Sequence, residues 1–349
     1  MTIQAQSLLW ISIGIFSVFF ISIVCSWFYG YFSDLYVKKV KGKIEDLVSS
    51  FFLAEDEERL PIVHSLKSYV DRSARRKEFL IDQIISYETE FIDRNHDLLM
   101  NFYEETGITS FLIKRLTSKN MNKKSLACRH IGDLKLVSTE AHILQLVSCK
   151  NNDVIYNMLL ALAKLGDTDG LAHILTNDSG NINISSRAII EIISAFNGSK
   201  EQLFKATIPF SDDYFKGILI KAAADYEIAE LRDYYIEILN SDNKNLRIAS
   251  IRALSELKNP ANEQYMIDML EDKDWEVRAI AAKCLEKLGT HHCFPALGKS
   301  TGDREWWVRH NAANSLISIP GGREYAAAII DGDDPYARDA VVSVLEKIS

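Results

Sequence analysis

The chain has 349 residues, a formal net charge of −8, 47% hydrophobic residues and 25% charged residues. These values are typical of a globular protein that is long enough to bury an extensive core. The negative net charge argues against a general nucleic-acid binder, because phosphate binding depends on clustered lysine and arginine. The five cysteines fit neither a disulfide framework nor the ligand spacing of a zinc site, and this usage suits a reducing cytoplasm.

The first 33 residues contain no charged side chain, and residues 8–28 form a continuous apolar stretch. About twenty residues that rise 1.5 Å each can cross a hydrocarbon core of about 30 Å, so this stretch predicts a single transmembrane helix. A cleavable signal peptide is the alternative. It requires a basic segment, a shorter apolar run and a small-residue cleavage site, and the sequence has none of these.

The charges that flank the apolar stretch predict its orientation. Lysines follow it at Lys38, Lys39, Lys41 and Lys43, whereas no basic residue precedes it. The positive-inside rule therefore places the N-terminus outside the cell membrane and the rest of this single-pass protein in the cytoplasm. Residues 34–101 are expected to form a helical juxtamembrane linker that is interrupted at Pro61, with a turn or helix boundary in the stretch LAEDEERLP at residues 53–61.

Residues 104–349 contain an internal repeat. Arg247, Arg278 and Arg309 are separated by 31 residues each, and Arg338 follows 29 residues later. The same position continues toward the N-terminus at Lys216, Ser186, Ile155 and Lys124. A period that is sustained over about eight units predicts a repeat architecture.

Each unit has the pattern of two antiparallel helices. In one unit these are expected near residues 263–271 and 274–288, and Val277, Ala281 and Leu285 share one face of the second helix. A lone pair cannot bury such an apolar stripe, so the sequence predicts an all-α solenoid of about eight stacked helix pairs. Asp272 and Asp303 are expected to be N-caps of the second helices.

Two units share the motif D-x-x-W-x-V-R-x-x-A-A-x-x-L. The residues of the first copy are Asp272, Trp275, Val277, Arg278, Ala281, Ala282 and Leu285. Those of the second are Asp303, Trp306, Val308, Arg309, Ala312, Ala313 and Leu316. The motif resembles HEAT-like repeats, specifically the short class named after phycobilin lyases. The resemblance implies the solenoid architecture, but it covers packing positions and does not imply lyase chemistry.

The residues predicted to contact a partner are Trp275, Trp306, Trp307, Arg278 and Arg309. Trp307 is the strongest of them, because it is additional to the repeating tryptophan, and tryptophan is enriched at binding hot spots. Two alternatives remain open. The repeating tryptophans can serve repeat packing, and the arginines can either bond neighbouring aspartates and carbonyls or form an anion-binding ladder.

The sequence predicts no enzyme, cofactor or metal. His291, His292 and Cys293 are adjacent and cannot all reach one ion from regular structure. None of the eight histidines precedes a glutamate, so the His-Glu pairs of iron-dependent HEAT-repeat hydroxylases are missing. Nucleotide-binding and hydrolase motifs are missing as well.

These features predict a membrane-anchored scaffold or accessory subunit that binds a protein partner at the cytoplasmic membrane face. A membrane-embedded glycosyltransferase or a transporter is an example of such a partner. A ligand-sensing regulator and a HEAT-repeat enzyme such as a lyase are the alternatives. A ligand-induced thermal shift would favour the regulator.

Overall fold

The computed structural model describes residues 2–87, 94–177 and 182–348, and these ranges are helical with no β-strand. The chain divides into two compact units, Met1–Thr117 and Ser118–Ser349. Each unit is described by itself below. The solenoid was predicted to begin at residue 104 and the linker to end at 101, and these boundaries stay predictions.

The first unit begins with one long helix, α1 (Thr2–Leu53). Its N-terminal part is apolar on every side, since the consecutive residues Val18–Ile21 each turn by about 100° and are all at least 59% exposed. By length and composition, α1 is the one helix among the described residues that is apolar enough to cross a membrane. The predicted transmembrane stretch of residues 8–28 lies within α1, which continues past it without a break.

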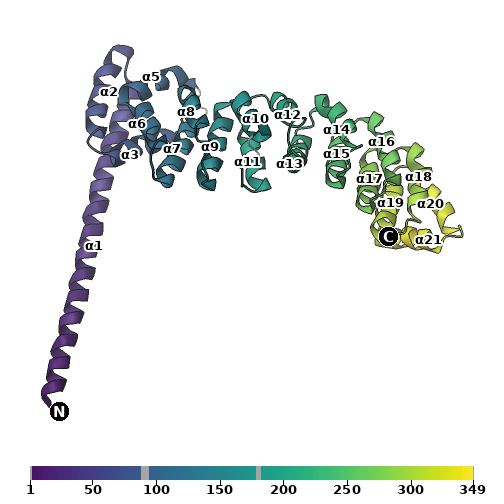
Figure 1. The fold of residues 1–349 in the computed structure, drawn as a ribbon, viewed down its shortest axis with the longest axis horizontal. Helices are drawn as coiled ribbons and strands as arrows, with labels where there is room; N and C mark the ends of the chain where they lie inside the picture. The colour runs from purple at the N-terminus through teal and green to yellow at the C-terminus, as the bar shows by residue number, and fades with distance from the viewer. Residues whose placement is uncertain (1, 88–93, 178–181, 349) are drawn as a thin grey trace. The chain divides into compact units, whose positions relative to one another are not determined.

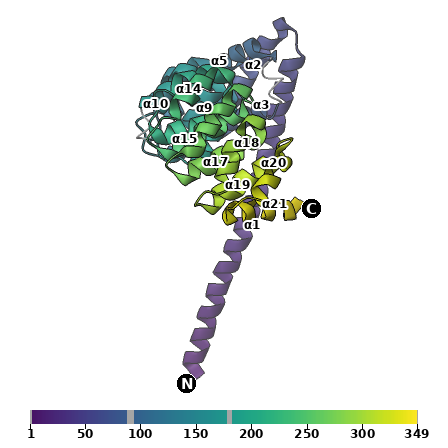
Figure 2. The same cartoon turned by 90° about the vertical axis from the view of Figure 1, so that its right-hand side faces the viewer.

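The second half of α1 has a different surface. Val40, Ile44, Val48 and Phe51 recur at helical spacing and are buried. This half packs against α2 (Asp56–Val70) and α3 (Ala74–Ile85), while the N-terminal half projects away from both helices in two orthogonal views (Figure 1 and Figure 2). The unit is completed by α5 (His96–Thr106), which packs on α2, and by α6 (Ile108–Leu116).

The predicted interruption at Pro61 is wrong, because Pro61 lies inside α2. The break between α1 and α2 falls earlier, at residues 54–55, within the stretch 53–61 where a turn or helix boundary was expected. Proline removes one amide donor, which in this helix would have bonded the carbonyl of Glu57. Glu57 is exposed in the first turn of α2, so water can satisfy that carbonyl and the helix continues.

In its described residues, the second unit contains eight helices that each form the second helix of a repeat. They are α7 (Met121–Asp133), α9 (Asn152–Leu165), α11 (Ser186–Ala195), α13 (Asp213–Ala224), α15 (Lys244–Glu256), α17 (Trp275–Leu288), α19 (Trp306–Ser318) and α21 (Pro335–Ile348). Each contains one of the eight residues that mark the sequence period, and each packs on the next (Figure 1). The predicted all-α solenoid is confirmed.

First helices, most of them shorter, alternate with these second helices. They are α8 (Glu140–Leu144), α10 (Thr168–Asn177), α12 (Lys200–Thr207), α14 (Arg232–Ile238), α16 (Glu263–Asp268), α18 (Phe294–Ser300) and α20 (Gly322–Ile330). The two helices predicted in detail correspond to α16 with its 3-10 continuation Met269–Glu271, and to α17. Within α17, Val277, Ala281 and Leu285 are fully buried and form the predicted stripe.

Replacement of an isoleucine by alanine should have different effects in the two halves of α1. Ile44 is 1% exposed and Ile23 is 67% exposed. We expect Ile44→Ala to lower the free energy of unfolding of the first unit by about 2–5 kcal/mol, because it leaves a cavity. The matched variant Ile23→Ala should change it by less than about 0.5 kcal/mol. Urea titration of the full chain in mild detergent measures both, and equal losses would contradict the packing described.

Candidate protein-binding surface

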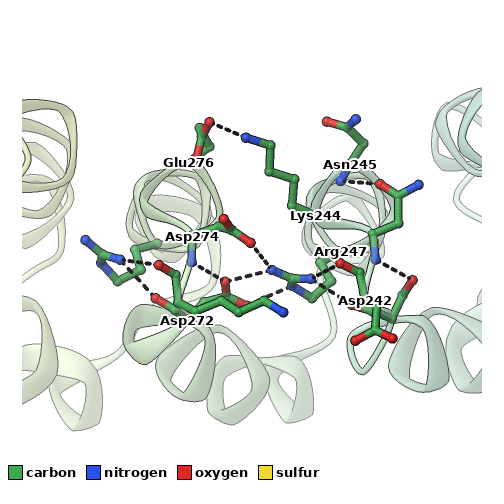
Figure 3. A network of polar contacts seen from close by, with 11 residues as sticks. Asp242, Lys244, Asn245, Arg247, Asp272, Asp274 and Glu276 are labelled. Atoms are coloured by element: carbon green, nitrogen blue, oxygen red, sulfur yellow. Dashed lines mark hydrogen bonds and ion pairs between the residues drawn. The ribbon is translucent and has the colours of Figure 1, made fainter.

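A buried ion pair links α15 to the repeat that follows it (Figure 3). Arg247 is 4% exposed and donates from Nε and Nη2 to the two carboxylate oxygens of Asp272, at 2.8 and 2.9 Å. Nη2 also donates to Asp274 at 2.7 Å, and Nη1 donates to the carbonyls of Ser241 and Asp242. The guanidinium therefore joins the loop before its own helix to the loop before α17.

The same arrangement recurs one repeat later. Arg278 is 6% exposed and donates from Nε and Nη2 to the two carboxylate oxygens of Asp303, at 2.8 and 3.0 Å. Its Nη1 donates to the carbonyl of Asp272 at 2.9 Å. We call these two pairs, Arg247 with Asp272 and Arg278 with Asp303, the arginine ladder. Bidentate arginine–carboxylate geometry fixes orientation as well as distance, so the ladder sets the register of successive repeats.

The ladder corrects the expectation that Asp272 and Asp303 are N-caps. The N-cap residues of α17 and α19 are Asp274 and Glu305, and neither makes a capping hydrogen bond with its side chain. Asp272 and Asp303 lie two residues earlier and accept the backbone amides of those N-cap residues. Each carboxylate is then shared with the arginine of the preceding repeat, which is a stronger, charge-assisted partner.

The electrostatics of the ladder favour its charged form. Hydrogen bonding to Asp272 raises the pKa of Arg247, and hydrogen bonding to Asp303 raises the pKa of Arg278. Burial opposes ionisation of Asp303, but the hydrogen bonds from Arg278 and from the Glu305 amide outweigh it and lower its pKa. Less buried ion pairs such as Lys244 with Glu276, at 2.6 Å, add less because solvent screens them more (Figure 3).

The predicted contact residues divide into two groups. Arg278 is enclosed in the ladder and offers little surface, and Trp275 is half-buried. Trp306 and Trp307 are 51% and 56% exposed at the start of α19. Arg309 is half-buried one turn further along. That these residues contact a partner stays a prediction, but Trp306 and Trp307 are the two with the most accessible area.

The structure adds two residues that the sequence did not predict to contact a partner. Tyr336 at the start of α21 is 64% exposed, and its ring lies 5.4 Å from the Arg309 guanidinium carbon. His310 stacks on Trp306 with ring centroids 4.9 Å apart. Tyr336 stands two residues before Arg338, as Trp307 stands two before Arg309, so the repeat register contained a signal for it. We call Trp306, Trp307 and Tyr336 the aromatic surface.

A pocket of about 400 Å³ lies between α19 and α21 beside the aromatic surface. Its lining includes Trp306, Arg309, His310, Tyr336 and Asp339. Burial lowers the pKa of His310, and the charge of Lys347 lowers it further, which favours the neutral imidazole stacked on Trp306. The pocket thus combines aromatic walls with one cation and one carboxylate.

The adjacent His291, His292 and Cys293 form a 3-10 helix. Cys293 is buried, and burial raises the pKa of its thiol to about 12. Its Sγ donates to the carbonyl of Thr290 at 3.0 Å. No group of three or more metal-ligating side chains gathers anywhere in the described ranges.

The repeat sequences themselves match a known family. The sequence model for HEAT repeats matches residues 202–285, 232–317 and 263–346. Residues 202–346 of this chain are HEAT repeats. No curated protein matches the chain in sequence. HEAT repeats suggest a protein-interaction role, and the narrower likeness to phycobilin-lyase repeats stays a prediction.

Three solved structures match the chain with low sequence identity and low TM-scores. An engineered protein has 15% identity and a TM-score of 0.35, covering 87% of this chain and 98% of its own. The CpcE–CpcF complex of phycocyanin lyase from Nostoc sp. PCC7120 has 14% identity and a TM-score of 0.31, covering 69% and 94%. Human deoxyhypusine hydroxylase in complex with glycerol has 12% identity and a TM-score of 0.30, covering 89% and 98%.

Removing one carboxylate of the ladder should destabilise the second unit in a pH-dependent manner. We expect Asp303→Asn to lower the free energy of unfolding by about 1–3 kcal/mol at pH 7, because Arg278 loses its charged acceptor. Since folding lowers the pKa of Asp303, its contribution is complete above about pH 4 and is lost as the pH falls through the folded value.

The difference between wild type and Asp303→Asn should therefore narrow below about pH 4. Denaturant titrations at several pH values measure it. Glu286→Gln is the matched control, because Glu286 is exposed on α17 and removing its charge should have little effect at any pH. A pH-independent difference would contradict the assignment of the ladder as an ionised pair.

Proposed function

We propose that this HEAT-repeat protein is a membrane-anchored scaffold or accessory subunit that binds a protein partner through the aromatic surface. The proposal assigns the chain a binding role and no catalytic one. A membrane-embedded glycosyltransferase or a transporter is the kind of partner that such an anchored module would serve, and the cytoplasmic face of the cell membrane is the proposed location.

The observation that carries this proposal is a comparison of equivalent repeat positions. Trp307 stands two residues before Arg309. The residues two before Arg278 and Arg247 are Glu276 and Asn245. Because the ladder forms with a polar residue at this position, repeat packing does not require tryptophan there. An exposed tryptophan without a packing role is typical of a binding hot spot.

The surface of α1 supports the membrane part of the proposal. A helix that is apolar all round needs an apolar environment on every side, whereas a helix at a protein surface needs it on one. The N-terminal half of α1 is apolar on every side, and from Val40 onward the helix has a single buried stripe. Lys38, Lys39, Lys41 and Lys43 lie at this change of surface, where anionic headgroups would meet them.

Charges introduced into the apolar half of α1 should release the protein from membranes. An aspartate at the centre of a transmembrane helix costs about 2.5–3.5 kcal/mol on insertion, so Phe19→Asp with Ile23→Asp should cost about 5–7 kcal/mol. We expect the double variant in the soluble fraction after carbonate extraction. The matched control, Phe19→Leu with Ile23→Leu, should stay in the pellet. Release of the control, or of the wild type, would contradict a membrane anchor.

Crosslinking in intact membranes followed by mass spectrometry tests the partner. We expect one protein to be recovered in stoichiometric amount with the wild type. Trp307→Ala should reduce its recovery at least about tenfold, as expected when a hot-spot side chain is lost. Glu276→Ala changes the equivalent position one repeat earlier and should leave recovery unchanged. Recovery of the monomer alone would contradict a scaffold role.

A further inference from the structure

Arg309 occupies the position that Arg247 and Arg278 hold in the two preceding repeats, and the arginine ladder does not continue beyond it. Its Nη1 donates to the carbonyls of Asp303 and Arg304, at 2.7 and 3.0 Å, as Arg278 donates to Asp272 and Lys273. Nε and Nη2, which hold a carboxylate in both preceding arginines, donate no hydrogen bond to any part of the chain that the structure describes. Arg309 therefore keeps half of the ladder contact and lacks the other half.

The sequence register explains the missing partner. Each ladder carboxylate stands six residues before the next arginine: Asp272 before Arg278, and Asp303 before Arg309. The corresponding residue before Arg338 is Gly332. The backbone matches, because Arg338 donates from Nη2 to the carbonyl of Gly332. The last repeat therefore keeps the carbonyl contact of the ladder but has no carboxylate at residue 332.

A nearby aspartate does not replace it. Asp334 corresponds to the N-cap residues Asp274 and Glu305, and its Oδ1 accepts the backbone amides of Tyr336 and Ala337. Arg309 instead has its guanidinium carbon 5.4 Å from the centre of the Tyr336 ring. Contact with the face of an aromatic ring leaves the N–H groups at the edge of a guanidinium available for hydrogen bonding.

We propose that the edge of Arg309 binds a carboxylate of the protein partner, supplied by an aspartate or glutamate next to an apolar side chain. This inference rests on the proposed function and names the chemistry that the site recognises. Nε and Nη2 would donate to the two oxygens, as Arg278 does to Asp303. The apolar neighbour would lie against Trp306 and Tyr336.

The rest of the pocket favours a peptide over an inorganic anion. Asp339 lines the same pocket of about 400 Å³ and would repel a small multiply charged ion such as phosphate. A peptide can place its carboxylate on Arg309 and direct a backbone N–H toward Asp339. The aromatic walls of Trp306 and Tyr336 offer an apolar side chain a contact that phosphate cannot use.

A pair of short peptides tests the site directly on the full chain in detergent. The probes are acetyl-Phe-Asp-Phe-amide and its neutral counterpart acetyl-Phe-Asn-Phe-amide, with inorganic phosphate as a third ligand, and isothermal titration calorimetry measures affinity. We expect the aspartate peptide to bind at least about tenfold more tightly than either of the others. Equal binding of the two peptides, absence of binding, or phosphate binding of the same strength would overturn the proposal.

Two variants remove the site in different ways. Arg309→Lys keeps the charge but loses the bidentate edge, and should abolish the preference for aspartate. Gly332→Asp restores the carboxylate of the last rung. We expect it to raise the Tm of the chain while blocking the aspartate peptide. An added Cβ at Gly332 would lie 3.2 Å from the carbonyl oxygen of Ile329, so that carbonyl has to move by a few tenths of an ångström for the variant to fit.

Gly332→Asn is the size-matched control, and it should block the peptide less than Gly332→Asp because a neutral amide is a weaker acceptor. An aspartate preference that persists in Arg309→Lys would overturn the proposal. Membrane crosslinking separates it from the proposed function. Equal recovery of a partner with wild type and Arg309→Lys would support the scaffold role but contradict the carboxylate site. Selective binding of the aspartate peptide without recovery of any partner would support the carboxylate site but contradict the scaffold role.

Discussion

Each second helix of the solenoid carries an apolar stripe that its own repeat cannot cover, and the next repeat has to cover it. This constraint explains why α15, α17 and α19 pack in succession and why Val277, Ala281 and Leu285 are fully buried. Apolar packing is not directional, so it leaves the rotation of one repeat on the next loosely defined. The arginine ladder supplies that definition, because a bidentate pair forms at only one register.

The ladder also shows how a structural device can leave a functional site where it ends. A buried arginine without a carboxylate would be costly, but Arg309 is half-buried and lies beside a pocket open to solvent. The last repeat can therefore lack the carboxylate, because water can solvate the charge of Arg309. The same two residues, Arg309 and Tyr336, then belong both to the packing of the last repeat and to the lining of this pocket.

Much of the fold follows from the sequence, because its period is long and regular. The 31-residue spacing of Arg247, Arg278 and Arg309 predicted the second helices, and eight are found in the described residues. The direction of pairing was harder to predict. Asp272 was expected to cap the second helix of its own repeat, yet its carboxylate binds Arg247 of the repeat before. Spacing alone cannot distinguish these partners, since stacking decides which side chains meet. The exposure of Trp306 could not be derived either, because its equivalent Trp275 is half-buried.

The unbroken course of α1 has a mechanical consequence. A helix has no soft torsion along its length, and α1 passes from its apolar half to the buried stripe at Val40 without a glycine-rich or serine-rich joint. If the apolar half is seated in a bilayer as proposed, the first unit cannot swivel freely about its anchor. Tilting or rotating the membrane segment would turn α2 and α3 with it. The anchor would then impose an orientation on the first unit as well as a location, which a flexible tether of equal length could not do.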